Sequence, residues 1–472
     1  MTRECGGVWT SPVLHHSSTP LLHFFEVKHE LMARVGLISL GCPKNVVDAE
    51  EILGQVEKAG HEIEVDPAGA EVLIVNTCGF IQSAKEESIE AILHAIRYKT
   101  DGACRSVIVT GCLAQRYGGE LAREIAEADG FVGLGKAERI PMLINQTLGG
   151  ERAVEIGEPS AWWTQSRSRI LSTAPWTAYL RVADGCDNRC TYCAIPDIRG
   201  GFRSRPEQHI LDEAGALADA GVKELNLIGQ DVTRYGLDTE GNLSLAPLLD
   251  KLAAIRGIRW IRLLYCYPTR ITEDLTRALA GNDKVCKYLD VPLQHSSDRV
   301  LRAMGRQGSR QEYLDLLGRA RAACPEVALR TTFIVGFPGE TEADFEDLLD
   351  FVSRARFDRV GVFRYSAEEG TPAASMADQV SRRTADRRHR ALMALQQEIS
   401  RQKNESLVGR AMDILVERVE GDTAVGRSHR DAPDIDGLVY VTGARCQPGA
   451  FVRAEITGAG EYDLSARVVS PE

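Results

Sequence analysis

"GCDNRCTYCAIPDIRG" (residues 185–200) places three cysteines, Cys186, Cys190 and Cys193, within eight positions. No histidine lies in the stretch, and the next cysteine along the chain is Cys266. A structural zinc site is closed by a full tetrahedral set of Cys or His ligands, whereas an iron–sulfur cube takes one thiolate per iron. Three thiolates would leave one iron with an open position, where a substrate or cofactor can bind. A zinc site completed by a distant cysteine is the alternative.

These cysteines follow a predicted strand at 177–183, which opens a series of apolar segments alternating with helical ones. Further strands are predicted at 224–229, 260–266, 288–293, 328–336 and 358–366. Six such repeats are typical of a partial (β/α)6 barrel. The loop after the first strand would lie at the C-terminal mouth of that barrel, where active sites of this architecture are found.

A separate N-terminal α/β domain is predicted from apolar segments at 34–40, 71–76 and 106–110, each followed by a helical stretch. This pattern indicates a parallel sheet. Cys42, Cys78 and Cys112 each follow one of the strands. Because ligands gather outside the carboxyl ends of parallel strands, we expect the three to converge on an auxiliary iron–sulfur cluster. A redox pair with a spare thiol is the alternative.

The remaining cysteines lack partners at ligand spacing, and we expect ordinary thiols there: Cys5, Cys104, Cys266, Cys286, Cys324 and Cys446. A disulfide framework is not expected in a cytoplasmic protein, which is the compartment we predict. No apolar run is long enough for a membrane span. The net charge of −11 argues against nonspecific coating of nucleic acid.

The chain of 472 residues is expected to divide into several domains. Residues 1–31 are predicted to be a disordered extension without a secretion leader, and Met32 is an alternative start. We assign 32–150 to the N-terminal domain, 151–175 to a linker and 176–404 to the barrel with its closing helix at 382–409. Short strands with Gly and Pro turns over 405–472 indicate a small all-β barrel.

Cys186, Cys190, Tyr192 and Cys193 match the CxxxCxΦC motif of radical S-adenosylmethionine enzymes, in which Φ is aromatic. The resemblance implies a 4Fe–4S cluster whose open iron binds S-adenosylmethionine and whose electron splits it to a 5′-deoxyadenosyl radical. "NLIGQD" (226–231) and "FIVGFPGET" (333–341) resemble family segments near the methionine and ribose moieties. It therefore implies contacts to S-adenosylmethionine from Tyr192, Gln230, Asp231 and Gly336.

The order of three domains resembles the methylthiotransferases, whose C-terminal barrel is a TRAM domain. "DVPLQHSSDRVLRAMGR" (290–306) and "YSAEEGTPA" (365–373) are further similar stretches. The resemblance implies insertion of CH₃–S into an unactivated C–H bond by two 4Fe–4S clusters. The Cys42/Cys78/Cys112 cluster would hold or donate sulfur, and the other would generate the radical. Such an enzyme needs an electron donor and a sulfur donor, and no side-chain acid or base is assigned.

Two substrate classes occur among these enzymes. The MiaB type modifies an adenosine in transfer RNA, and the RimO type modifies the β-carbon of an aspartate in the twelfth protein of the small ribosomal subunit. "VGLISLGCPKNVVDAE" (35–50) is similar to the RimO-type start, whereas MiaB-type proteins read more like "YGCQMN". "CAIPDIRGGFRSR" (193–205) and "GRSHRDAPDIDGLVY" (426–440) also favour the RimO type.

Charge in the C-terminal segment agrees with a basic protein substrate. Residues 405–472 hold 12 Asp or Glu, 7 Arg and no Lys, so their net charge is 7 − 12 = −5. That sign repels phosphates and attracts a basic ribosomal protein, so nucleic-acid contact would be secondary. Asp434 and Asp436 are candidate substrate contacts, and a solvated turn is the alternative. A transfer-RNA methylthiotransferase and a noncatalytic iron–sulfur or ribosome-binding factor remain as alternative functions.

Overall fold

The computed structural model describes residues 32–159, 169–443 and 445–469. Met32–Glu472 form one compact unit. The expected disorder of residues 1–31 and the thiol Cys5 lie outside the described residues. None of the helices in the described ranges is both long and apolar enough to cross a membrane.

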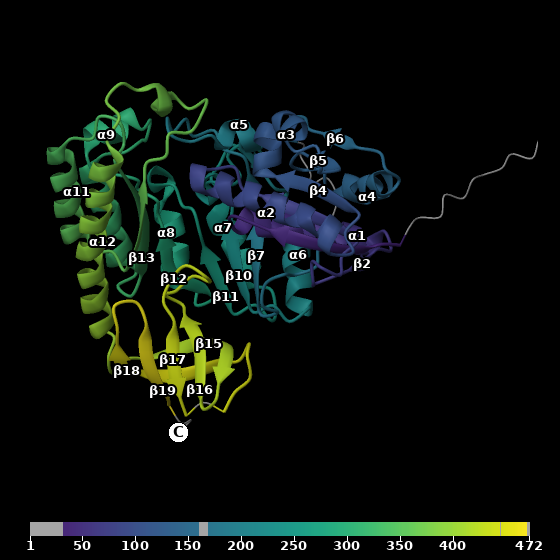
Figure 1. Ribbon diagram of the computed structural model, residues 1–472. Coiled ribbons are helices and arrows are strands. Elements are labelled where there is room, and N and C mark those ends of the chain that lie inside the picture. The colour runs from purple at the N-terminus through teal and green to yellow at the C-terminus, as the bar shows by residue number, and fades with distance from the viewer. Residues whose placement is uncertain (1–31, 160–168, 444, 470–472) are drawn as a thin grey trace, which may run out of the picture. The chain divides into compact units, whose positions relative to one another are not determined.

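The N-terminal region is a parallel sheet of six strands in the order β2-β1-β3-β4-β5-β6 (Figure 1). The strands are β1 (Arg34–Ser39), β2 (Glu62–Ile63), β3 (Val72–Thr77), β4 (Ser106–Gly111), β5 (Gly130–Val132) and β6 (Ala153–Glu155). The helices are α1 (Pro43–Lys58), α2 (Gln82–Asp101), α3 (Cys112–Glu124) and α4 (Ile140–Leu148). Strands β3 and β4 are buried along their whole length, because α2 and α3 pack on one face of the sheet and α1 and α4 on the other. Their apolar runs are continuous for that reason.

This sheet extends further than the sequence indicated. The three predicted strands are confirmed as β1, β3 and β4, and β2, β5 and β6 join them. Strand β6 lies inside the stretch 151–175 that was predicted as a linker, and its Val154 pairs with Phe131 of β5. The linker prediction is therefore wrong for Ala153–Glu155. Three residues beside Gly149 and Gly150 carry too little apolar pattern to be recognised as a strand.

The central region is an open parallel sheet in the order β14-β13-β12-β11-β10-β7, which confirms the partial barrel. Its strands are β7 (Thr177–Arg181), β10 (Glu224–Ile228), β11 (Trp260–Leu263), β12 (Val285–Asp290), β13 (Ala328–Val335) and β14 (Arg359–Arg364). A short ribbon of β8 (Ala183–Asp184) and β9 (Arg203–Ser204) flanks the cysteine loop. The helices are α5 (Ile195–Arg199), α6 (Glu207–Asp219), α7 (Leu245–Ala253), α8 (Glu273–Gly281), α9 (Asp298–Ala303), α10 (Arg310–Ala323), α11 (Glu342–Ala355) and α12 (Arg382–Glu405).

Two strands differ from their predicted ranges for identifiable reasons. Strand β11 ends at Leu263, shortly before Tyr265, whose φ of 63° cannot continue a strand. Strand β12 begins three residues earlier than predicted, at Val285. The charged Lys287 interrupts the apolar pattern of this strand, and in the structure its Nζ donates to carbonyls at the end of α8. The strand ends before Pro292, which has no N–H for a ladder.

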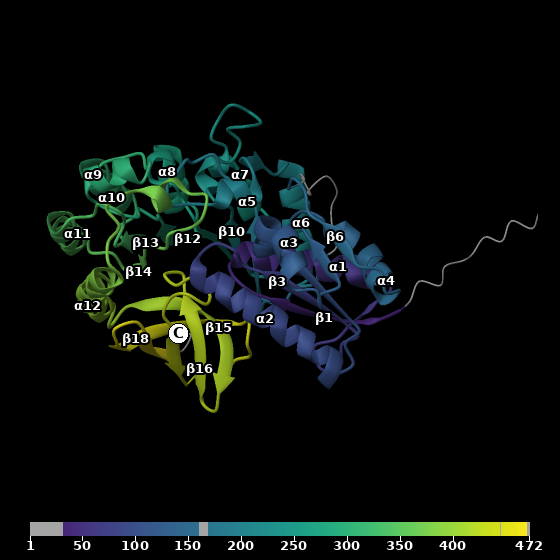
Figure 2. The same cartoon turned by 45° about the horizontal axis from the view of Figure 1, so that its top comes forward.

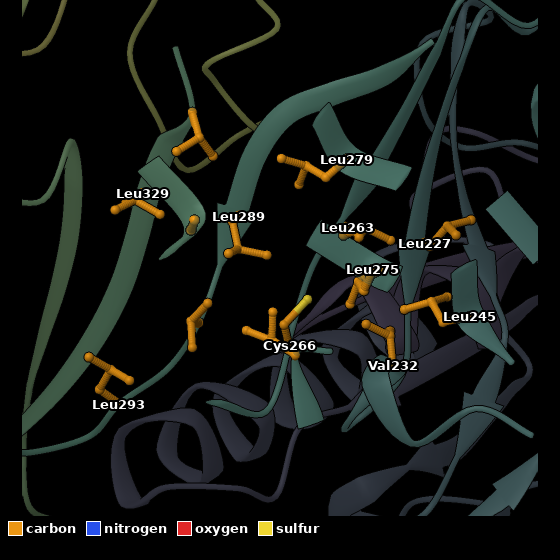
Figure 3. Packing of buried hydrophobic residues seen from close by; sticks show 14 of the residues in the cluster. Leu227, Val232, Leu245, Leu263, Cys266, Leu275, Leu279, Leu289, Leu293 and Leu329 are labelled. Atoms are coloured by element: carbon orange, nitrogen blue, oxygen red, sulfur yellow. The ribbon is translucent and has the colours of Figure 1, made fainter. Parts of the chain in front are cut away.

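The two faces of the central sheet differ in chemistry. The outer face packs leucines against the helices, and Cys266 lies among these leucines as an ordinary buried thiol (Figure 3). The other face carries buried charged residues, among them Arg181, Glu224 and Arg262. The strands of the central sheet therefore alternate apolar and charged side chains, and both kinds are buried.

The C-terminal region is a closed barrel of five strands in the order β15-β16-β17-β19-β18, as predicted. Its strands are β15 (Ala411–Glu420), β16 (Thr423–Ser428), β17 (Val439–Thr442), β18 (Phe451–Ala459) and β19 (Leu464–Val468). Helix α12 runs beside α11 in both views and leads into this barrel (Figures 1 and 2). A buried ion network joins the two regions, because Glu224 of β10 accepts from Arg262 of β11 and from Arg427 of β16.

Candidate active site

The structure brings the three N-terminal cysteines together at one edge of the sheet. Cys42 precedes α1, Cys78 follows β3, and Cys112 is the first residue of α3. Cys112 interacts electrostatically with both Cys42 and Cys78. Gly41 has a φ of 97°, and a Cβ at that position would come within 3.2 Å of the Cys78 sulfur. Parallel strands end at the same edge, so cysteines about 35 residues apart in sequence become neighbours.

Asn45 holds this edge in place, although no sequence motif marked it as a functional residue. Its fully buried amide donates to the carbonyls of Leu40 and Thr77, both at 2.9 Å, and so ties the ends of β1 and β3 together. Its Oδ1 lies 3.6 Å from the Cys112 sulfur. The sequence did contain a hint of this role. Asn45 lies three residues after Cys42, at the start of a helix where no turn requires an asparagine.

Burial and nearby cations set the ionisation of these thiols. Burial raises the pKa of Cys112 to about 12 and also raises the pKa of Cys78. Burial alone would raise the pKa of Cys42 as well, but Lys44 and Arg199 outweigh it and the pKa is lowered. Cations beside a thiol favour the thiolate, which is the form that binds metals.

The second cysteine group lies on the loop after β7, at the mouth of the central sheet. Cys186 donates its N–H to the carbonyl of Gly200 at 3.1 Å, and Cys193 donates to the carbonyl of Cys190 at 3.1 Å. Cys193 interacts electrostatically with both other cysteines, and burial raises its pKa to about 12. The loop therefore folds back on itself and presents all three thiols together.

Tyr192 and Arg306 lie beside this loop. The Arg306 guanidinium is 3.9 Å from the Cys190 sulfur and stacks 4.3 Å from the ring centroid of Tyr267. Tyr192 packs with Phe337 and Met304 in a small apolar cluster. Arg306 ends the sequence stretch 290–306, and the structure gives it a contact with a cysteine of the loop.

A buried polar group, which we term the Arg199 bridge, joins the two cysteine groups. It consists of Asn45, Asp48, Asp184 and Arg199. Arg199 follows the cysteine loop on α5 and donates to Asn45 at 2.9 Å and to Asp48 at 2.7 Å, both on α1. Cys112 also packs with Ala194, the residue after Cys193. The two cysteine groups are therefore neighbours, connected by a fully satisfied ionic contact.

Three further predicted contacts lie near the cysteine loop. Both amide atoms of Gln230 are buried and make no hydrogen bond to the described residues, which suits a polar ligand. Asp231 is committed to the protein, because it accepts from Asn188 at 3.1 Å and from Arg270 at 2.6 Å. Gly336 donates its N–H to Glu340. Asp231 thus supports the loop through Asn188, and its direct contact with S-adenosylmethionine stays a prediction.

The two aspartates predicted to bind a basic substrate differ. Asp436 is buried at the joint between the two barrels, where it accepts from Tyr288 Oη at 2.7 Å and faces Arg330 at 3.6 Å. That carboxylate is not available to a substrate, so its predicted role is wrong. Asp434 is exposed, with Tyr179 donating to it at 3.3 Å, and its role stays a prediction.

Three family models match the chain. They are the radical SAM superfamily over residues 180–352, the uncharacterized family UPF0004 over 34–133 and the TRAM domain over 408–469. The chain is 50% identical over 439 residues to the ribosomal protein uS12 methylthiotransferase RimO of Desulforudis audaxviator, covering 93% of this chain and 97% of that protein. It is 49% identical to the protein of that name from Geobacter sulfurreducens, covering 93% and 99%.

This chain belongs to the RimO methylthiotransferase family. Solved structures agree at the level of fold. The radical S-adenosylmethionine methyltransferase TsrM of Kitasatospora setae, with tryptophan and a S-adenosylmethionine analogue bound, superimposes with a TM-score of 0.56. The match has 15% sequence identity and covers 78% of this chain and 89% of that one.

The donor sets of this RimO-family chain suit clusters better than single ions. Among the residues described, no three His, Cys, Asp or Glu side chains converge closely enough to hold one metal ion. In an iron–sulfur cube each thiolate binds a different iron, so its thiols stand wider apart. The structure has two groups of three neighbouring cysteines, with the charge of Arg199 acting on the first group and Arg306 in contact with the second, and a set of three thiols is what an iron–sulfur cube with one open iron takes.

Proposed function

We propose that this protein transfers a methylthio group to the β-carbon of an aspartate in ribosomal protein uS12, using S-adenosylmethionine and two 4Fe–4S clusters. The observation that carries the proposal is the Arg199 bridge, which makes the two cysteine groups neighbours. A single bound side chain can then reach both. The names of the relatives supply the substrate.

Each cluster has a proposed set of ligands in this chain. Cys42, Cys78 and Cys112 would hold the auxiliary cluster, and the loop cysteines 186, 190 and 193 would hold the other. When bound, the auxiliary cluster would supply sulfur, and the other cluster with S-adenosylmethionine would supply a carbon radical. Such a radical can remove hydrogen from a C–H bond that is too strong and too weakly acidic for a base.

The protein's own contribution is positioning, charge and exclusion of water. Arg199 is a cation shared between Cys112 and Cys42, and Arg306 contacts Cys190. Asp231 fixes Asn188, whose N–H lies 3.4 Å from the Cys186 sulfur. S-adenosylmethionine would contact Tyr192, Gln230 and Asp231, together with the segment around Gly336.

Outside the site, the proposal includes an electron donor, a sulfur donor and a cytoplasmic location. The acidic C-terminal barrel would approach basic uS12, with Asp434 as the exposed carboxylate at that surface. Nucleic-acid contact would be secondary.

Iron analysis tests the two-cluster part. We expect about eight irons per chain after anaerobic reconstitution, with Mössbauer parameters of 4Fe–4S centres. About four irons would remove the auxiliary cluster. Incubation with dithionite and S-adenosylmethionine should release 5′-deoxyadenosine, and no release above background would favour a noncatalytic factor.

Mass spectrometry tests the substrate. In a strain that lacks this protein, uS12 should lose the mass of a methylthio group while transfer-RNA adenosines keep theirs. The reverse pattern would assign the transfer-RNA reaction instead. Complementation with the wild-type chain must restore the missing mass.

A further inference from the structure

Lys44 is a buried cation beside the auxiliary cysteines. It lies in the first turn of α1, two residues after Cys42, with 7% of its surface exposed. Its ammonium sits 3.3 Å above the ring centroid of Tyr265. No hydrogen bond or ion pair joins that ammonium to any of the residues the structure describes. An ammonium has three N–H donors, and one aromatic face leaves them available to a ligand.

The carboxylates that face Lys44 are occupied by other partners. Asp290 accepts from Arg330 at 2.9 Å and from the backbone N–H of Tyr265 at 2.9 Å. Asp184 accepts from Arg199 at 3.3 Å and from the N–H of Gly185 at 2.9 Å. Lys44 therefore lacks the carboxylate partner that a buried lysine normally has.

Tyr265, which forms this contact, is held in an unusual backbone conformation. Its φ of 63° is unusual for a large aromatic residue, and such strain is found at binding and catalytic sites. The neighbouring Cys266 donates its N–H to the carbonyl of Asp290, which fixes the strained turn. Both Lys44 and Tyr265 interact electrostatically with Cys42, so the pair lies at the sulfur-bearing side of the site.

We propose that Lys44, held on the face of Tyr265, binds the carboxylate of the target aspartate and selects it over an amide. The inference rests on the proposed function. The β-carbon of aspartate is bonded directly to its carboxylate carbon. Binding the carboxylate therefore places the carbon to be modified beside Cys42, and an amide cannot form the charged contact. Lys44 acts as a specificity-determining residue of the substrate site.

Equilibrium binding of two peptides tests the inference. One is a fluorescent peptide of uS12 spanning the target aspartate, and the other carries asparagine at that position. We expect the reconstituted wild-type chain to prefer the aspartate peptide by about ten- to a hundredfold in Kd, the range of one charged hydrogen-bonded contact. Lys44→Met should weaken the aspartate peptide by that factor and leave the asparagine peptide nearly unchanged.

The ratio of the two Kd values separates recognition from a structural effect. A general loss of structure weakens both peptides alike, whereas loss of carboxylate recognition brings the ratio to about one. Lys58→Met, an exposed lysine at the end of the same helix, is the matched control and should keep the wild-type ratio. A Lys44→Met chain that still prefers aspartate by the wild-type ratio would overturn the inference.

Conservative variants guard against misfolding. Lys44→Arg keeps the charge and should keep a preference for aspartate, and equal binding of both peptides by this variant would count against the inference. Tyr265→Phe keeps the ring and should bind as the wild type does. Tyr265→Leu should reduce the ratio by about threefold or more, since a buried cation–π contact is lost. An unchanged ratio in Tyr265→Leu would remove the ring from the proposal.

The two proposals can fail separately. A wild-type chain that methylthiolates the aspartate peptide but binds both peptides equally would refute carboxylate selection alone. A wild-type chain that modifies neither the peptide nor uS12 would refute the proposed function, and the inference with it.

Discussion

The two cysteine groups reach similar arrangements by different routes. In the loop group, eight consecutive residues hold all three thiols, and local hydrogen bonds such as Cys193 to Cys190 shape them. In the N-terminal group, the thiols lie on three strand ends, and Asn45 ties two of those ends together. The first site is encoded in a segment of chain, and the second exists only when the sheet is formed.

Different substitutions therefore damage the two sites. The loop group is vulnerable to changes within the loop and its supports, Asp231 and Arg306. The N-terminal group is also vulnerable to changes in the sheet that leave every cysteine in place. Substitutions in the Arg199 bridge should affect both groups, because this bridge connects them.

Removing one cysteine from each group gives the largest expected effect. Cys190→Ala should reduce release of 5′-deoxyadenosine below detection, because the group that cleaves S-adenosylmethionine loses a ligand. Cys112→Ala should retain much of that release while methylthio transfer stops. Chromatographic quantification of both products checks this division. Equal loss of cleavage in the two variants would contradict the separate roles.

Cutting the bridge should destabilise the protein strongly. Arg199→Met leaves the buried carboxylate of Asp184 and the partly buried carboxylate of Asp48 with Arg181 as their cation, which should cost roughly 3 kcal/mol of unfolding free energy, the low end for breaking a buried ion pair. Denaturant unfolding of the reconstituted chain measures it. Methylthio transfer should fall further than cleavage does. Arg123→Met, at an exposed position on α3, is the control and should change the unfolding free energy by less than about 0.5 kcal/mol.

A substitution in the sheet should disturb the N-terminal group alone. Gly111 has a φ of 93°, and a Cβ there would collide with the backbone oxygen of Thr77. Gly111→Ala should cost roughly 2–4 kcal/mol and reduce bound iron by about half, since only one site depends on this sheet edge. Gly119→Ala, in the following helix where a Cβ meets nothing within 4 Å, should retain full iron. Parallel loss of 5′-deoxyadenosine release in Gly111→Ala would show that the sites are not independent.

The smallest effect concerns acid stability at the joint of the two barrels, which neither cysteine group controls. Burial, with Arg430 and Arg262 nearby, lowers the pKa of His429 to about 3. In the unfolded chain, His429 binds a proton below its ordinary pKa of 6.5, whereas in the folded chain it stays neutral. The free energy of unfolding therefore falls as pH decreases. From pH 7 to 5 the loss due to His429 should be about 1 kcal/mol, discounted for its partial exposure.

Urea titrations at both pH values check this slope. His429→Gln should be less sensitive to acid by that amount, and Arg123→Met, at an exposed position on α3, should keep the wild-type slope. A His429→Gln chain with an unchanged slope would place the acid sensitivity elsewhere.

Much of the fold could be predicted because its signals are local. Apolar runs in β3 and β4 are continuous since helices cover both faces of the sheet, and Gly and Pro turns mark the C-terminal strands. Short edge strands such as β6 could not be predicted, because three residues carry no periodicity. The charged inner face of the central sheet was also missed, since its partners lie on segments far away in sequence, as Arg427 does from Glu224.

The sequence by itself determined the loop site, because its three thiols share one turn of chain and their spacing alone limits what they can hold. It also indicated that Cys42, Cys78 and Cys112 end their strands. Only the tertiary structure decided that Asn45 and Arg199 connect the groups, that Asp436 is buried, and that Lys44 meets Tyr265. These are contacts between residues that many positions separate, and their energies depend on burial, which no local pattern of sequence specifies.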